Sequence, residues 1–315
     1  MKSNGPSIPE SLELSEEDVR WVSLTFGVTL YTDALFSEVP EAMLRSFNLF
    51  LNTIPPDSLR FYSTETMRKH KPITKRTFGM LEAWSRPDAP ARKDIDLELK
   101  DGNAYQDAPK FKFHVCAGEK GSTKYKHKLS NVVSMAFPAE WGMERADDLL
   151  KYVENLCSFF PFQSGHAGFS FEYSRYAAKE GQQHAWNESM RHRGIDISGV
   201  PKDTFAVGQD GAKGVGWLTI LSEQYVEQIG GLANLQRSLS KDIELIDVPS
   251  GTIIKAGPMP LIGDVNEPDD LSLYREVYRV IEPLVETAAG RCKAWTLGGT
   301  PLEKTKTWYR RLSDA

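Results

Sequence analysis

The stretch that decides the fold runs from Trp141 to Gly199. It contains ADDLLKYVENLCSFFP (residues 146–161) and then GHAGFSFEY (residues 165–173). Apolar residues of the first segment recur at three- and four-residue steps, which predicts an amphipathic helix that Pro161 ends. Aromatic residues at alternate positions of the second segment predict a strand. Another helix is predicted before Arg193, so helix, strand and returning helix can hold one core together.

The segments on either side of this stretch show the same two periodicities. Residues 22–30 alternate between apolar and polar, which predicts a half-buried strand. Pro40 opens a predicted helix, and Pro55 and Pro56 end it. Residues 243–248 and 252–256 flank a Pro-Ser-Gly turn and predict a hairpin. Antiparallel strand pairs with helices between them indicate an α+β fold, a mainly antiparallel sheet with helices packed on it.

The chain has 315 residues, enough for one large domain or two small ones. Residues 1–18 have many acidic and few apolar side chains, so we expect a flexible acidic arm. Residues 19–290 are predicted to form a single α+β domain. Two similar halves are an open alternative, because strand–helix–strand order recurs around 21–62 and 216–256. The tail, residues 291–315, contains Trp295 and Trp308 and is expected to pack on the domain.

Composition narrows the class of protein. With 40% hydrophobic and 26% charged residues, the chain has the composition of an ordinary soluble protein. Its net charge of -5 disfavours direct binding to nucleic acid and is compatible with a basic protein partner. The cysteines, Cys116, Cys157 and Cys292, are too far apart to indicate a disulfide framework. No signal peptide and no apolar run of spanning length is recognised, so we expect a cytoplasmic protein without a membrane partner.

No motif indicates catalysis, a cofactor or a metal. His166 lies between Gly165 and Ala167 at the start of a strand, but a catalytic base needs a positioned partner, and a core or turn histidine is the favoured interpretation. The glycines of 208–216 precede a strand, whereas a phosphate loop follows one. The cluster Asp264, Glu267, Asp269 and Asp270 lacks calcium-loop spacing and fits a helix N-terminus. We therefore expect no catalytic residues, no cofactor and no bound metal.

Residues 85–106 are rich in Pro and Asp and are predicted to form an irregular surface loop. Its acidic residues are Asp94, Asp96, Glu98 and Asp101. Acidic side chains on an irregular segment can attract a basic protein surface. These four residues are the predicted partner-binding site.

Motifs in the second half resemble those of a bacterial family, first catalogued as a domain of unknown function, that includes immunity proteins of the type VI secretion system. The resemblance spans about residues 21–284 and is strongest from Trp141 onward. It is closest to immunity proteins paired with restriction-endonuclease-like nuclease toxins. The segments that carry it are Gly165-His166-Ala167-Gly168-Phe169, Arg193-Gly194-Ile195-Asp196, Trp217-Leu218-Thr219, Gly230-Gly231-Leu232, Gly257-Pro258 and Gly263-Asp264-Val265-Asn266.

The resemblance implies a protein that binds and neutralises a cognate toxin, expected to be a DNA-cleaving nuclease, rather than an enzyme. It also implies that the protein acts in the cytoplasm of the cell that makes the toxin. No catalytic residue is carried over. Two alternatives stay open: an adaptor that loads the toxin without inhibiting it, and a small-molecule enzyme that uses His166 with a nearby carboxylate.

Overall fold

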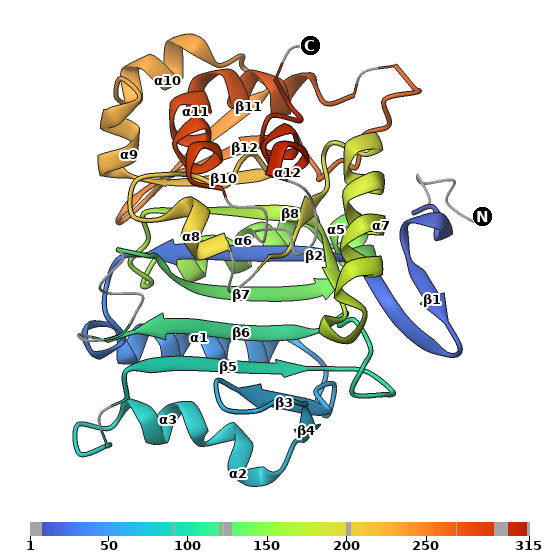
Figure 1. Cartoon of the computed structure of the whole chain (residues 1–315). Coiled ribbons are helices and arrows are strands. Elements are labelled where there is room, and N and C mark those ends of the chain that lie inside the picture. Colours follow the sequence, from blue (N-terminus) through green and yellow to red (C-terminus); the bar gives the residue numbers. More distant parts are fainter. Residues whose placement is uncertain are drawn as a thin grey trace.

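The computed structural model describes residues 8–90, 92–119, 122, 128–199, 203–268, 270–292 and 302–313. These residues form a 12-stranded sheet with helices on both faces (Figure 1). The strands are β1 (Leu14–Glu16), β2 (Val19–Thr32), β3 (Phe61–Thr64), β4 (Lys71–Pro72), β5 (Asp94–Lys100), β6 (Lys112–Gly118), β7 (Asn131–Pro138), β8 (Ser164–Tyr173), β9 (Asp196–Ile197), β10 (Leu218–Ser222), β11 (Ile243–Val248) and β12 (Gly251–Ala256).

The strand order is β11-β12-β10-β8-β2-β7-β6-β5-β3-β4, with β1 beside β2 and β9 beside β8. Neighbouring strands are antiparallel, except that β9 runs parallel to β8. The α+β prediction is therefore confirmed. Outward from the centre, one side follows β2-β7-β6-β5-β3 and the other β8-β10-β12-β11, so the strand connections of the two sides differ.

The structure contains both α-helices and short 3-10 helices. The predicted helix after Trp141 is divided at Arg145, which has φ -136° and ψ 34°. The 3-10 helices are η1 (Glu10–Leu12), η2 (Phe36–Glu38) and η3 (Arg175–Ala177). The α-helices are α1 (Pro40–Thr53), α2 (Lys75–Phe78), α3 (Met80–Ser85), α5 (Ala139–Glu144), α6 (Ala146–Cys157), α7 (Ala178–Arg191), α8 (Asp203–Val207), α9 (Glu223–Gln228), α10 (Leu232–Ser238), α11 (Ser272–Arg291) and α12 (Leu302–Tyr309).

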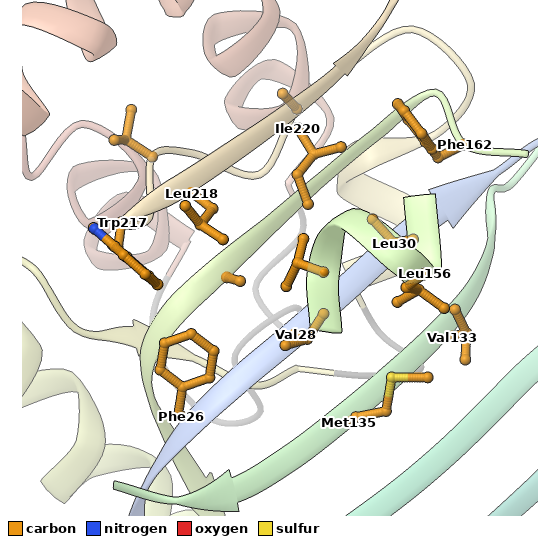
Figure 2. Packing of buried hydrophobic residues seen from close by; sticks show 14 of the residues in the cluster. Phe26, Val28, Leu30, Val133, Met135, Leu156, Phe162, Trp217, Leu218 and Ile220 are labelled. Atoms are coloured by element: carbon orange, nitrogen blue, oxygen red, sulfur yellow. The ribbon is translucent and has the colours of Figure 1, made fainter. Parts of the chain in front are cut away.

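One face of the sheet is apolar and carries the main core. Alternate residues of β2, β7 and β10 meet Leu156 of α6, as Figure 2 shows. Phe26 and Trp217 pack edge to face with ring centroids 6.1 Å apart, and Phe47 of α1 lies 4.9 Å from Phe113. Burial of large side chains of this kind contributes about 1.5–3 kcal/mol each. The hydrophobic alternation of the strands thus fixes which face receives α1, α5 and α6.

The opposite face is mostly polar. A small apolar cluster lies here, in which Val207 of α8 packs on Tyr31, Cys116 and Val132. In Figure 1, α7, α8 and α12 lie in front of this face, and no described helix lies in front of β5 and β6. The polar side chains of β5 and β6 are therefore the part of this face with the least helical cover.

Both ends of the described chain pack on the domain, the N-terminal segment on β2 and the C-terminal helix on α7 and α11. In the predicted acidic arm, β1 pairs with β2 and Leu12 is fully buried, so residues 10–16 differ from the flexible segment that we expected. Residues 1–7 and Trp295 lie outside the described residues. In the tail, Trp308 is fully buried and its Nε1 donates to Ser189 Oγ at 2.9 Å. Tertiary contacts with β2 and α7 thus position both segments.

The prediction of an irregular loop over residues 85–106 is wrong for its central part. Asp94–Lys100 forms β5, which pairs with β3 and β6 along its length. Its apolar residues Ile95, Leu97 and Leu99 are buried in the core. Their alternation with charged residues is a strand pattern, and the Pro- and Asp-rich flanks obscured it.

Candidate functional site

The charged residues of β5 lie on the polar face of the sheet. Because side chains alternate along a strand, Asp94, Asp96, Glu98 and Lys100 face away from the apolar core. In the antiparallel register, Glu98 pairs with His114, and Lys100 pairs with Lys112 on β6. Paired residues share a face, so Lys112 and His114 of β6 lie beside the charged residues of β5 on the polar surface of the sheet.

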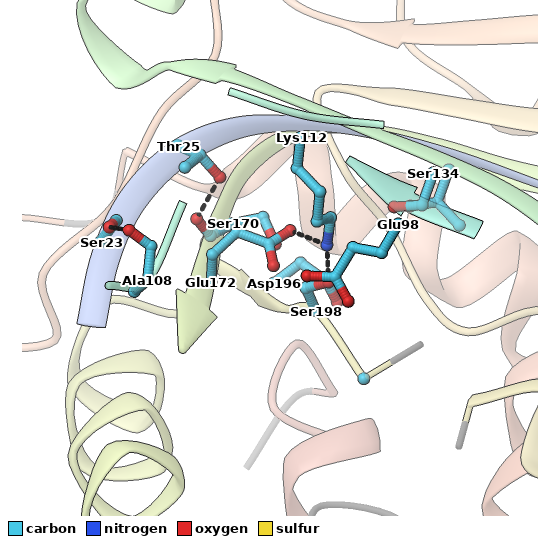
Figure 3. Close-up of polar contacts among 12 residues, drawn as sticks. Ser23, Thr25, Glu98, Ala108, Lys112, Ser134, Ser170, Glu172, Asp196 and Ser198 are labelled. Carbon is cyan, nitrogen blue, oxygen red and sulfur yellow. Dashed lines mark hydrogen bonds and ion pairs between the residues drawn. The ribbon is translucent and has the colours of Figure 1, made fainter. Parts of the chain in front are cut away.

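A cavity of about 340 Å³ opens on this surface, between β5, β6, the end of β8 and the start of α7. Figure 3 shows several of the polar side chains near it, with Lys112 close to Glu172 and Ser198. The lining includes His70, Glu98, Lys112, His114, Glu172 and Gln182. We call this cavity the polar pocket.

Lys112 and Glu172 form a buried ion pair in the polar pocket. Their side chains are 5% and 7% exposed, and Lys112 Nζ also donates to Ser198 Oγ at 3.0 Å. The two residues come from β6 and β8, which are separated in the sheet by β7 and β2. This ion pair therefore ties the middle of the sheet together beneath the pocket.

Glu98 is the centre of a second charged group. It accepts from His70 Nε2 at 3.1 Å and from Arg175. Burial alone would raise the pKa of Glu98, but Arg175 and His70 outweigh it and hold that pKa well below its usual value. Glu98 is thus an ionised carboxylate whose charge is already neutralised inside the protein.

His70 is held as a neutral imidazole. Burial lowers its pKa, despite the opposing effect of Glu98. The backbone N–H of His70 donates to Tyr176 Oη at 2.9 Å, and the Tyr176 hydroxyl is then free to donate to His70 Nδ1 at 3.0 Å. With the ring proton on Nε2 facing Glu98, every polar atom of this group has a partner.

The other predicted site residues differ in their exposure. Asp96 accepts from His114 Nε2 at 3.0 Å and its side chain is 26% exposed. Asp101 accepts from the backbone N–H of Lys110 at 2.8 Å and lies 3.5 Å from Arg20. Asp94 is exposed and forms no ion pair with a described residue. Of the four predicted residues, Asp94 is therefore the one whose negative charge is most available to a partner.

The structure thus joins Asp96 to His114, and Glu98 to His70 and Arg175, partners that the sequence did not assign to any site. Lys112 lies in the same pocket, and burial lowers the pKa of the nearby Lys100 to about 8. Lys112 and His114 alternate with buried Phe113 and Val115, so the strand pattern carried a signal for their common face. Nothing in the local sequence indicated their carboxylate partners.

A second buried network lies between β8, β9 and α8. Lys213 Nζ is 2.9 Å from Asp196 Oδ2 and 2.6 Å from Asp203 Oδ2. His166 Nε2 lies 3.2 Å from Asp196 Oδ2, and the Tyr31 hydroxyl donates to Asp203 Oδ2 at 3.4 Å. Burial would raise the pKa of Asp196, but Lys213 and His166 hold it far below its usual value.

This network gives His166 the carboxylate neighbour that the enzyme alternative requires. Asp196 is also bound by Lys213, and His166 is 7% exposed. A buried histidine that is hydrogen-bonded to a carboxylate of an ion-pair network has a sufficient structural role. The interpretation of His166 as a core residue therefore fits its surroundings.

One residue of the acidic cluster before α11, Asp264, forms an ion pair. Arg191 Nη2 lies 2.7 Å from Asp264 Oδ2. The helix begins at Ser272, two residues after Asp270, and Asp269 lies outside the described residues. Among described residues, no group of three or more His, Cys, Asp or Glu side chains could hold a metal ion.

The helices in the described part of the chain include none that is long and apolar enough to cross a membrane.

Comparisons with known proteins place this fold. A search of curated proteins finds no match. Among solved structures, the Pseudomonas aeruginosa T6SS protein PA0821 is similar, with a TM-score of 0.78 and 19% sequence identity over 96% of this chain and 88% of that chain. At this identity the likeness concerns the fold alone. The family model for type VI immunity for VRR-NUC matches residues 42–312, which confirms the resemblance seen in the sequence. The chain therefore belongs to the family of type VI immunity proteins for VRR-NUC.

Proposed function

We propose that this protein binds a VRR-NUC toxin of the type VI secretion system and suppresses its nuclease activity by direct protein–protein contact. The observation that carries the proposal is the family match over residues 42–312, which extends from α1 to the end of α12 and so includes nearly the whole fold. Because such a toxin would attack the chromosome of its own producer, the complex would form in the cytoplasm of that cell.

We place part of the interface at the mouth of the polar pocket. Asp96 lines the pocket and is partly exposed, and Asp94, two residues earlier on β5, is exposed. Glu98 and Asp101 lie behind them, where their ion pairs and hydrogen bonds hold the end of β5. A nuclease attracts DNA with a basic surface, and an acidic surface on an inhibitor competes for the same charges. Asp94 and Asp96 are the contact residues in this proposal, and Glu98 and Asp101 support them.

The test uses the purified protein and its cognate VRR-NUC toxin. Equimolar protein should form a complex with the toxin and abolish cleavage of duplex DNA. A complex that still cleaves DNA would favour the adaptor, and the absence of a complex would refute the immunity role. In that case a search for small-molecule turnover, with His166→Ala as the inactive control, would test the enzyme alternative.

The interface is tested by charge reversal at the exposed position. Asp94→Lys should lower the association rate constant about 3- to 10-fold at low salt, with a smaller effect at high salt. Glu282→Lys is the matched control, because Glu282 is an exposed acid on α11, remote from β5 in Figure 1. Equal association rates for the two variants would remove Asp94 from the interface and leave the immunity role intact.

A further inference from the structure

A basic segment forms one edge of the sheet, beyond the polar pocket. All five of its cationic side chains are exposed, and none forms an ion pair with a described residue. No acidic residue occurs between Thr66 and Leu81, and Glu65 just before them is held by Arg92. The segment runs from the end of β3 through β4 into α2. We call Arg68, Lys69, Lys71, Lys75 and Arg76 the basic edge.

Protection of the sheet edge explains only part of this charge. Lysine and proline on an edge strand prevent pairing with another chain, and β4 consists of Lys71 and Pro72. Arg68, Lys75 and Arg76 lie outside β4 and have no such role. In a chain with a net charge of -5, five unneutralised cations in nine residues form a local field that favours an anionic partner.

A cavity walled partly by aromatic and apolar side chains adjoins the same cations. It has a volume of about 320 Å³ and is lined by Tyr62, Arg76, Met80 and Trp84, among others. Lys71 pairs with Tyr62 across β3 and β4, and Arg76 is itself part of the cavity wall. Phe78, beside them in α2, is 38% exposed. Aromatic groups surrounded by charges at a surface are typical of an interaction site.

We propose that the basic edge binds an acidic patch of the toxin and that an apolar toxin side chain occupies the adjoining cavity. This inference rests on the proposed function, because it specifies the chemistry of the toxin surface. A protein partner fits these features better than single-stranded nucleic acid. Proteins that bind single strands provide a basic groove that follows the phosphate backbone and several aromatic side chains on which bases stack. Here one aromatic cavity adjoins a short run of cations on an otherwise acidic molecule.

The charge is tested with a triple variant, Lys71→Glu, Lys75→Glu and Arg76→Glu. The control is Lys151→Glu, Lys179→Glu and Lys241→Glu, three exposed lysines on other elements that give the same change in formal charge. Binding to immobilised toxin is measured at 50 mM and 500 mM NaCl. At low salt the basic-edge variant should associate about 10- to 100-fold more slowly than wild type, and the control less than about 3-fold more slowly.

The cavity is tested with Gly79→Leu. Gly79 lines the cavity, and a Cβ built on it has only Arg76 O within 4 Å, at 3.8 Å. Its backbone angles, φ -87° and ψ 1°, are accessible to leucine. This variant should fold normally and dissociate from the toxin about 10-fold faster, since a filled cavity excludes the toxin side chain.

Three outcomes separate the possibilities. Wild-type affinity in the charge-reversed and Gly79→Leu variants, with their urea midpoints unchanged, would overturn this inference and leave the immunity role standing. Micromolar binding of a 20-nucleotide single-stranded DNA that the basic-edge variant loses would also overturn it, because the edge would then be a nucleic-acid site. Failure of the wild-type protein to bind the toxin would refute the proposed function and the inference together.

Discussion

Replacing Lys213 by methionine should be one of the most destabilising single changes in this protein. The lysine side chain is 2% exposed, and its ammonium group lies between Asp196 and Asp203, whose side chains are 12% and 1% exposed. Methionine has a similar length and no charge, so the variant keeps the packing and removes the cation. Two carboxylates would remain in a site from which water is largely excluded.

The expected cost follows from what each carboxylate retains. Asp196 keeps His166 at 3.2 Å. Asp203 keeps the Tyr31 hydroxyl and the Gly199 backbone N–H at 3.1 Å, while its Oδ1 has no hydrogen-bond partner among described residues. Removing one partner of a buried ion pair costs about 3–5 kcal/mol. We expect the free energy of unfolding to fall by about 4 kcal/mol at pH 7.

Urea unfolding monitored by tryptophan fluorescence and circular dichroism measures this change. Lys151→Met, at an exposed position of α6, is the control and should have a negligible effect. Adding Asp203→Asn to Lys213→Met should recover part of the loss, because one of the two unpaired charges disappears. A loss below about 1 kcal/mol in the single variant would refute the argument that this network is buried and mutually neutralised.

The pH dependence provides an independent check of the same reasoning. In wild type the pKa of Asp196 is far below its usual value, so the stability from this ionised carboxylate is present at neutral pH and is lost as pH falls through the folded-state value. Without Lys213, burial has less to oppose it and raises the pKa of Asp196, and protonation of Asp196 relieves the unpaired charge. The stability difference between wild type and Lys213→Met should therefore shrink between pH 7 and pH 4.

Other parts of the structure give further expected outcomes. Because burial lowers the pKa of His70, the unfolded state binds a proton more readily below about pH 6.5; stability should fall between pH 7 and pH 5, and the fall should be smaller in His70→Gln, as measured by urea midpoints. Gly194→Ala would place a Cβ 2.3 Å from Leu261 O, so we expect a loss of about 1–3 kcal/mol by thermal unfolding, and an unchanged Tm would contradict it. Trp308→Ala should cost about 3–5 kcal/mol and speed limited proteolysis of the C-terminal tail, whereas Trp186→Ala, on a partly exposed ring, should cost less.

The sequence predicted those elements whose signals are local. The alternation of residues 22–30 predicted the core of β2, and the recurring apolar residues after Ala146 predicted α6. Ser222 directly precedes α9, and its Oγ accepts from the Tyr225 backbone N–H at 3.3 Å, as a helix N-cap does. Residues 94–100 show the same strand alternation, although we predicted a loop there. Their alternation of charged and apolar residues is that of a strand, but the composition of the flanking residues led to the prediction of a loop.

The sequence by itself determined the α+β class, the antiparallel pairing and the family, because periodicity, turns and motif order are written along the chain. The tertiary structure alone decided which charges meet. Lys112 and Glu172 are 60 residues apart, and Arg175 and Glu98 are 77 apart, so no local pattern specifies these pairs. Asp96 and Glu98 are likewise paired with His114 and Arg175 inside a pocket, and are not the free charges of a loop that the sequence predicted. The energy of an ion pair depends on the distance between the two charges and on their burial, and both are set by the order of the strands in the folded sheet.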